Sequence, residues 1–224
     1  MPRGLTRRLP TVLLAAALAG ALATTGCADE AAAAHVGDKT ISDDQLMTQV
    51  EALYGNNKLW QAIDQQNGQQ PGSSRSELRG DAPGSFKQSF VATILQDQIT
   101  FELIDQLFAD EDLEVTDDYR QAAEQAQQDR FGEFFADFPK HYRDQQLSQY
   151  ARLVSVQDNL GDGYGEALMT LIDETDIDVS SRYGSWDPEA FKAQFSDNAT
   201  SQLAVVPPPG PAPAPGSDPA GAGD

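Results

Sequence analysis

The sequence predicts a mainly α-helical domain whose two ends are joined by a small two-stranded sheet. Apolar side chains recur at helical spacing through most of residues 42–172. Two β-prone stretches, residues 35–41 and 177–183, flank this helical region. Because a lone strand is unstable in water, we expect the two stretches to pair and to bring the ends of the domain together.

The first expected helix follows the first β-prone stretch. Ser42 precedes two aspartates and Gln45, a capping-box pattern that marks a helix start. Apolar residues continue at helical spacing as far as Gly55, where we expect this helix to end. A weaker pattern over residues 57–66 predicts a second short helix around Trp60.

The longest apolar stripe runs from Phe86 to Phe108, about six helical turns. It follows residues 67–84, a polar stretch rich in glycine and proline that predicts a long loop. Ser85 and Gln88 repeat the capping-box pattern, so we expect the helix to begin there. Its length and apolar content predict that it lies at the centre of the domain.

Two further long helices are expected in the second half of the chain. Thr116 is followed by two aspartates, which is typical of a helix start, and helical spacing then continues to residue 138. Pro139 stops that helix and suits the first turn of another one, which runs to Leu160.

Shorter elements complete the expected domain. Residues 164–172 predict a short helix ahead of the second β-prone stretch. After that stretch, Asp187 as a cap and Pro188 as the first helical residue predict a final helix that ends near Phe195.

Both ends of the chain differ in composition from this domain. Residues 1–26 have a basic start and an apolar run over 12–22, which is typical of a signal peptide and short for a membrane span. Residues 197–224 end in a stretch rich in proline, glycine and alanine, and we expect this tail to be disordered. The folded domain should therefore comprise residues 35–196.

Cys27 is the only cysteine and directly follows the apolar run. Residues 22–27 (LATTGC) resemble the lipobox of bacterial lipoproteins, in which the cysteine thiol is acylated, although Thr24 stands where leucine is preferred. The alternative is an unmodified thiol beside an ordinary signal-peptidase site. We expect lipid attachment at Cys27, a spacer over residues 27–34, and export to the outer face of the bacterial cytoplasmic membrane.

The charge of the chain disfavours two classes of partner. The net charge is −20, from 35 acidic and 15 basic residues, and three of the basic residues lie in the expected signal peptide. Such an acidic surface repels nucleic acid and anionic lipid headgroups, so neither is an expected partner. The same charge keeps a protein soluble when it exposes apolar surface to another chain.

Four short segments, spread over roughly residues 35–190, resemble the SurA/PrsA-type foldase chaperones. Residues 36–42 (VGDKTIS) resemble the turn that opens their helical domain, and residues 115–119 (VTDDY) resemble one of its helix starts. Phe138 and Pro139 before the next long helix are a third similarity. Residues 177–187 (IDVSSRYGSWD) resemble the closing strand and ending of lipoproteins with a SurA-type N-terminal domain.

This resemblance implies a helical SurA N-terminal-like domain that holds unfolded exported proteins near the membrane. Better-known members add a parvulin-type peptidyl-prolyl isomerase domain, but no segment of this chain remains for one. The expected function is therefore that of a lipid-tethered holdase without isomerase activity. The alternative is a structural or adaptor lipoprotein of the cell envelope that binds one dedicated protein partner.

No set of client-binding residues follows from the sequence alone. Phe131, Phe134, Phe135 and Phe138 could form part of an apolar binding surface, as could Trp60. Aromatic residues at this helical spacing are more often part of a core, so both interpretations of the four phenylalanines stay open.

Nothing in the sequence predicts an enzyme, a metal or a cofactor. Lipidation would consume Cys27, and His35 and His141 are far apart without metal-ligand spacing. Most acidic pairs stand at expected helix starts or in loops, where capping accounts for them. Three acidic residues near the second β-prone stretch lack the pattern of a calcium loop, namely Glu174, Asp176 and Asp178.

Overall fold

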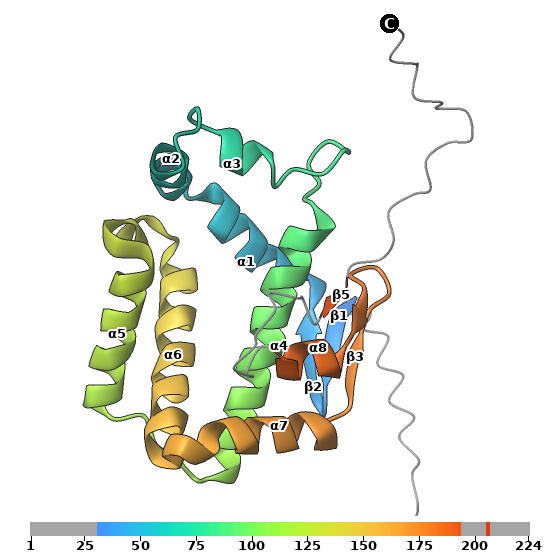
Figure 1. Ribbon diagram of the computed structural model, residues 1–224, viewed down its shortest axis with the longest axis vertical. Helices are drawn as coiled ribbons and strands as arrows, with labels where there is room; N and C mark the ends of the chain where they lie inside the picture. Colours follow the sequence, from blue (N-terminus) through green and yellow to red (C-terminus); the bar gives the residue numbers. More distant parts are fainter. Residues whose placement is uncertain (1–30, 194–204, 207–224) are drawn as a thin grey trace, which may run out of the picture.

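The computed structural model describes residues 31–193 and 205–206, and it shows a helical domain with a small sheet at one side (Figure 1). The predicted signal peptide, Cys27 and residues 207–224 lie outside the described residues. The helices are α1 (Asp43–Gly55), α2 (Asn57–Gln66), α3 (Ser73–Ser76), α4 (Gln88–Asp110), α5 (Asp117–Phe131), η1 (Gly132–Asp137), α6 (Lys140–Leu160), η2 (Gly161–Gly163), α7 (Tyr164–Glu174) and α8 (Pro188–Ala193). The strands are β1 (Ala32–Val36), β2 (Lys39–Ser42), β3 (Ile177–Val179), β4 (Ser185–Trp186) and β5 (Val205–Val206).

The predicted meeting of the two ends of the domain is confirmed, but the sheet has three strands. β1 lies in the middle and pairs antiparallel with β2 and with β3, in the order β2-β1-β3. Ala34 is opposite Val179 and Val36 is opposite Ile177. The third strand arises because the chain folds straight back at Gly37, whose positive φ of 58° suits a residue without a Cβ.

The expected spacer over residues 27–34 is wrong at its C-terminal end. β1 begins at Ala32, and Ala33 and Ala34 are fully buried in the core. Alanine has little preference for strands, so a run of four alanines carried no strand signal. Its small side chain nevertheless fits where β1 packs against α4.

The second β-prone stretch and the tail also differ from the prediction. β3 ends at Val179, and the amides of Tyr183 and Gly184 both donate to the carbonyl of Ser180 in a turn. The chain then forms β4, which pairs with β5 at residues 205–206, inside the segment expected to be disordered. The pairing with β4 accounts for this exception, because two valines favour a strand once a partner edge is present.

The predicted central helix is α4, and it lies in the middle of the molecule (Figure 1). Its buried side chains cover most of its circumference rather than one stripe, since the sheet, α1, α6 and α7 all pack against it. Leu95, Ile99 and Leu103 are fully inaccessible to solvent. Burial of this kind stabilises a fold by roughly 1.5–3 kcal/mol for each large aliphatic side chain, so α4 organises the main core.

Three predicted helix caps are confirmed and one is wrong. The side chains of Ser42, Thr116 and Asp187 accept hydrogen bonds from the amides three residues further on, at 3.1, 3.3 and 3.0 Å. Ser85 does not cap α4, because its hydroxyl donates to the carbonyl of Ala82 within the preceding turn. The helix instead begins at Gln88 without a side-chain cap.

Two helix boundaries in the second half also differ from the prediction. The helix from Thr116 ends at Phe131, not at residue 138, because Gly132 adopts a φ of 56° and starts a short 3-10 segment. Pro139 precedes the next helix as its cap residue rather than opening its first turn. α5 and α6 then form an antiparallel pair, seen to the left of α4 in Figure 1.

The predicted loop over residues 67–84 is more ordered than its composition indicates. It contains α3, which is held against α2 by a buried carboxylate: Asp64 accepts from the amides of Gly72 at 2.6 Å and Ser74 at 2.7 Å. The guanidinium groups of Arg75 and Arg79 both lie over the ring of Tyr54 on α1. Among the helices formed by the described residues, none has the length and apolar character that crossing a bilayer requires.

Candidate functional site

Three of the four phenylalanines considered as client-binding residues belong to a second, smaller core. Phe131, Phe135 and Phe138 are at most 9% exposed. The ring centroids of Phe131 and Phe138 are 5.0 Å apart, and the ring of Phe138 lies 4.7 Å from that of Tyr142. Such close aromatic pairs belong to packed interiors, so these side chains hold the turn between α5 and α6 in place. Phe134 is half-buried and could contact another molecule.

The central helix α4 and the helix after Pro139, α6, leave accessible apolar surface between them. A hollow of about 380 Å³ lies there, and we call it the α4–α6 groove. Half-buried Phe101, Leu153 and Tyr164 provide its apolar surface, while Arg130 reaches it from α5. Its complete lining is Asp97, Thr100, Phe101, Ile104, Arg130, Tyr150, Leu153, Gln157 and Tyr164.

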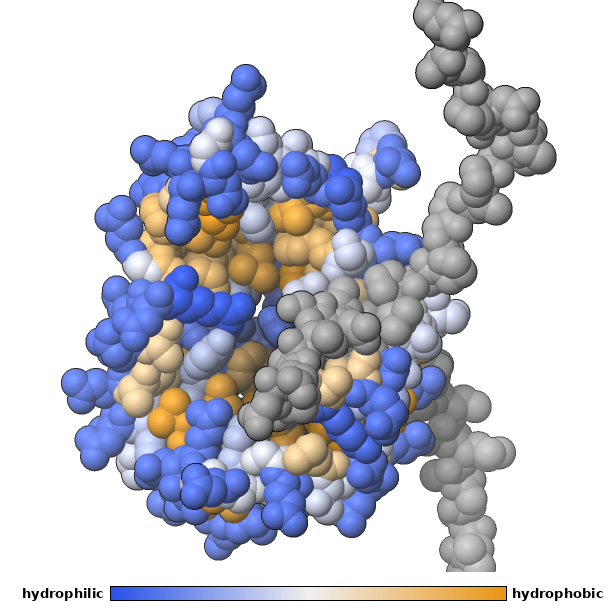
Figure 2. Space-filling model, viewed as in Figure 1, coloured by the Kyte–Doolittle hydropathy of each residue, from blue (hydrophilic) through white to orange (hydrophobic). Residues whose placement is uncertain are grey.

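Apolar residues are visible on the face of the molecule shown in Figure 2. They gather around a hollow in the middle of that face, and hydrophilic residues follow its outer edges. This distribution matches the composition of typical ligand sites, in which an apolar surface carries a few convergent polar groups.

Two charged groups, Asp97 and Arg130, distinguish the α4–α6 groove from an ordinary gap between helices. The Nη1 atom of Arg130 donates to the Tyr150 hydroxyl at 2.7 Å, and the Tyr150 ring lies 5.5 Å from that of Phe101. Burial raises the pKa of the Asp97 carboxyl, and the positive charge of Arg130 opposes this rise only in part. Burial also raises the pKa of Tyr142, on which Arg130 and Asp97 act electrostatically. Asp97, Arg130 and Tyr150 therefore line one groove where α4, α5 and α6 meet.

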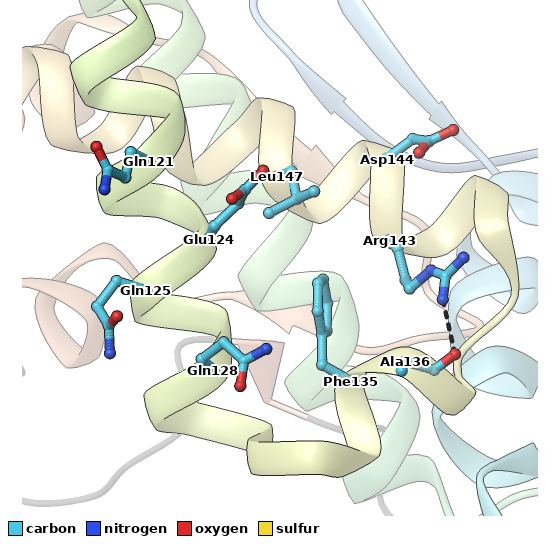
Figure 3. A pocket seen from close by; sticks show the side chains of 9 residues that line it. All are labelled: Gln121, Glu124, Gln125, Gln128, Phe135, Ala136, Arg143, Asp144 and Leu147. Atoms are coloured by element: carbon cyan, nitrogen blue, oxygen red, sulfur yellow. Dashed lines mark hydrogen bonds between the residues drawn. The ribbon is translucent and has the colours of Figure 1, made fainter.

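A larger hollow of about 530 Å³ lies between α5, η1 and α6 (Figure 3), and we call it the α5–α6 pocket. Phe135 and Leu147 point into the space between the helices, whereas Gln121 and Gln125 project away from Phe135. Arg143 closes one end, since its Nη1 atom donates to the carbonyl of Ala136 at 2.7 Å.

The α5–α6 pocket has a mostly polar wall. Its full lining is Gln121, Glu124, Gln125, Gln128, Phe135, Ala136, Arg143, Asp144 and Leu147. A neighbouring hollow of about 320 Å³ shares Glu124 and Leu147 with it, so the depression continues along the seam between α5 and α6. Phe135 is almost fully buried, so it adds little accessible apolar surface to the α5–α6 pocket.

Trp60, the other aromatic residue considered for client binding, is half-buried on α2. Its Nε1 atom donates to the carbonyl of Leu53 at 2.9 Å, which fixes the ring against the end of α1. The nearby Asn56 side chain caps α2 and donates to the carbonyl of Phe134 at 3.1 Å. Trp60 is therefore an anchored side chain that joins the two helices and lines neither groove.

The remaining candidate residues are not brought together. His35 is exposed on β1 beside Thr40, and His141 is exposed at the start of α6. In the part of the chain that the structure describes, no group of three or more histidine, cysteine, aspartate or glutamate side chains is placed to hold a metal ion. Cys27 lies outside that part of the chain.

No sequence motif selected Asp97, Arg130 or Tyr150 as site residues. Asp97 stands next to Gln98 within the apolar stripe of α4, and a charged residue in such a stripe was the one available signal. Arg130 and Tyr150 lie on two other helices, and only the packing of α6 against α4 and of α5 against α6 brings them to the same groove as Asp97.

Comparisons of this chain with protein-family models, with curated proteins and with solved structures find no match.

Proposed function

We propose that this protein is a lipid-tethered, extracytoplasmic holdase that binds unfolded segments of exported proteins. The observation that carries the proposal is the α4–α6 groove, an accessible hollow lined by aromatic and aliphatic side chains. The outer edges of the domain are hydrophilic (Figure 2). Its volume lies within the range of about 300–1,000 Å³ that is typical of small ligand sites. A groove of this size suits a few side chains of an extended chain rather than a folded partner.

The chemistry of the groove supports weak and broad binding. Phe101, Leu153 and Tyr164 in its lining are half-buried, so a bound side chain would remove only part of their surface from water. The flat rings of Phe101, Tyr150 and Tyr164 can pack against many different apolar side chains, since such contacts are not directional. A holdase needs this combination, because it must release its clients again.

The surface charge supports the same proposal. The chain carries a net charge of −20, and its acidic residues keep a protein soluble while an apolar groove stays open. The lipobox-like residues 22–27 support a tether through acylated Cys27 at the membrane surface, where exported chains emerge. The similarity of four segments to SurA/PrsA-type chaperones agrees with this function.

The second candidate is an adaptor lipoprotein with one dedicated partner, and one observation favours it. Among the described residues, Met169 on α7 is the one large hydrophobic side chain that is exposed by more than a third. A holdase for many clients would need a larger contiguous apolar surface, since exposed apolar patches mark where a protein contacts other chains. An adaptor would instead need only a small groove of defined shape.

The experiment that separates the two candidates measures the aggregation of several unrelated unfolded proteins. Both hydrophobic clusters consist of residues between Ala33 and Phe191, so a soluble version that starts at residue 28 keeps the core. A holdase suppresses aggregation of most substrates at near-stoichiometric amounts, whereas an adaptor suppresses none.

A pair of variants on α4 tests the role of the groove. Phe101→Ala removes a half-buried ring that lines the groove, and Phe108→Ala removes a half-buried ring two turns further along the same helix and outside it. We expect Phe101→Ala to lose most of the protection and Phe108→Ala to keep it, at equal folded fractions. Equal loss in both variants would assign the effect to stability and would contradict the proposal.

A further inference from the structure

The Asp97 carboxylate is the unusual group of the α4–α6 groove. It is half-buried on α4, and in the described part of the chain it has neither a hydrogen bond nor an ion pair. Another carboxylate on the same helix behaves differently: Asp105 pairs with Arg152 of α6 at 2.5 Å. A half-buried carboxylate that lacks a partner costs stability, so its presence in an accessible groove points to a partner that arrives with a ligand.

Arg130, the basic residue in the lining of the groove, does not supply that partner. Its guanidinium donates to the Tyr150 hydroxyl of α6 and lies 5.0 Å from the centre of the Phe131 ring, and these two contacts hold it in position. Its charge acts on Asp97 only from beyond ion-pair distance. The carboxylate therefore keeps its capacity to accept hydrogen bonds from an incoming cation.

We propose that the α4–α6 groove binds unfolded segments in which a lysine or arginine stands next to aromatic or aliphatic residues, with Asp97 as the partner of the cation. The apolar neighbours of that cation would pack on Phe101, Leu153 and Tyr164. This inference rests on the proposed holdase function and specifies its clients. The net charge of −20 supports it, because an acidic protein attracts basic segments and repels acidic ones.

The part of the chain after Lys192 does not offer a competing cation. After Lys192 the sequence has no lysine, arginine or histidine, and its charged side chains there are aspartates. The tail after residue 206 therefore lacks the group that Asp97 would pair with. Charge complementarity thus favours a separate chain as the occupant of the groove.

Two short labelled peptides test this inference with the soluble protein. One carries lysine between leucine and phenylalanine, and the other has glutamine in place of that lysine. We expect the lysine peptide to bind about tenfold more tightly, the size of one charge-assisted hydrogen bond in a half-buried site. Asp97→Asn should remove this preference, while Asp110→Asn at the exposed end of the same helix should retain it.

Fluorescence anisotropy gives the dissociation constants, and the aggregation assay is run in parallel. A preference for lysine that persists in Asp97→Asn overturns the inference, even if Phe101→Ala still abolishes binding and the holdase proposal stands. If the protein suppresses aggregation but binds neither peptide, clients bind elsewhere and the inference is overturned as well.

If the protein neither binds a peptide nor suppresses aggregation, the proposed holdase function itself fails. Binding that appears only after removal of residues 207–224 would identify the tail as the occupant and would also overturn the inference.

Discussion

Replacing Phe138 and Phe134 in turn by alanine tests whether the phenylalanines around η1 form core or binding surface. Phe138 is 3% exposed and contacts the rings of Phe131, Phe135 and Tyr142. Phe134 lies in the same short segment but is half-buried. Its backbone carbonyl accepts the hydrogen bond from Asn56, and an alanine would keep that bond.

The two substitutions differ in expected magnitude. Phe138→Ala removes a ring from a packed cluster and leaves a cavity, which costs about 3–5 kcal/mol in the free energy of unfolding. The three ring contacts are part of that figure and are not added to it, because they are lost together. Phe134→Ala removes a ring that already faces water on one side, and we expect about 1 kcal/mol.

Urea unfolding followed by circular dichroism at 222 nm measures both variants against the unmodified protein. With a urea dependence of about 2 kcal/mol per molar, Phe138→Ala should lower the unfolding midpoint by about 1.5–2.5 M, and Phe134→Ala by about 0.5 M. The unfolding slope should stay the same, which shows that the variants differ in stability and not in compactness.

The same variants are then tested in the aggregation assay below their unfolding transitions. If Phe138→Ala costs no more than Phe134→Ala, the cluster around Phe138 is not a core and the assignment is refuted. If Phe138→Ala leaves stability unchanged but removes client protection, the surface interpretation that the sequence left open would be the right one.

Three further outcomes follow from the structure and from the sequence. Hydrogen bonds from Ser74 and Gly72 lower the pKa of Asp64, so the stability that this carboxylate contributes is present above pH 3.8 and is lost as the pH falls through its pKa in the folded protein. Trp60 fluorescence should therefore show α3 detaching in acid. Asp64→Asn should detach α3 at every pH. Burial raises the pKa of Asp97, so the stability that its charged form costs is absent below pH 3.8 and complete above its pKa in the folded protein. Asp97→Asn should therefore raise the thermal unfolding midpoint at pH 7. A lower midpoint would contradict the assignment of an unpaired carboxylate. Cys27→Ala should move the protein from the membrane fraction to the soluble fraction of cells, and a variant that stays membrane-bound would rule out the lipid tether.

The sequence was most informative where a signal is local. Helix starts at Ser42, Thr116 and Asp187 were predicted because a side-chain cap needs only the three following residues. The same logic failed at Ser85, where a turn within the preceding loop offered the hydroxyl a nearer acceptor. A local pattern shows which hydrogen bond a side chain can form, and competition between neighbouring acceptors and donors decides which one it forms.

Elements that depend on a distant partner were predicted less well. The pairing of the two ends was expected because each stretch alone would be unstable, yet β1 includes alanines that carried no strand signal. β5 likewise forms beside β4 from a segment expected to be disordered. Strand formation depends on the edge that is available, which single-sequence patterns do not contain.

The sequence by itself determined that the chain forms a helical domain around one long apolar helix and that its surface is strongly acidic, because hydrophobic periodicity and charge are properties of consecutive residues. Only the tertiary structure decided which aromatic residues are core and where a groove remains. Phe138 and Phe101 have the same side chain, but one is enclosed by three other rings and the other lies at the edge of a hollow. The position of Asp97 beside Arg130 and Tyr150 likewise results from the packing of α4, α5 and α6, since residues far apart in sequence meet only when these helices come together.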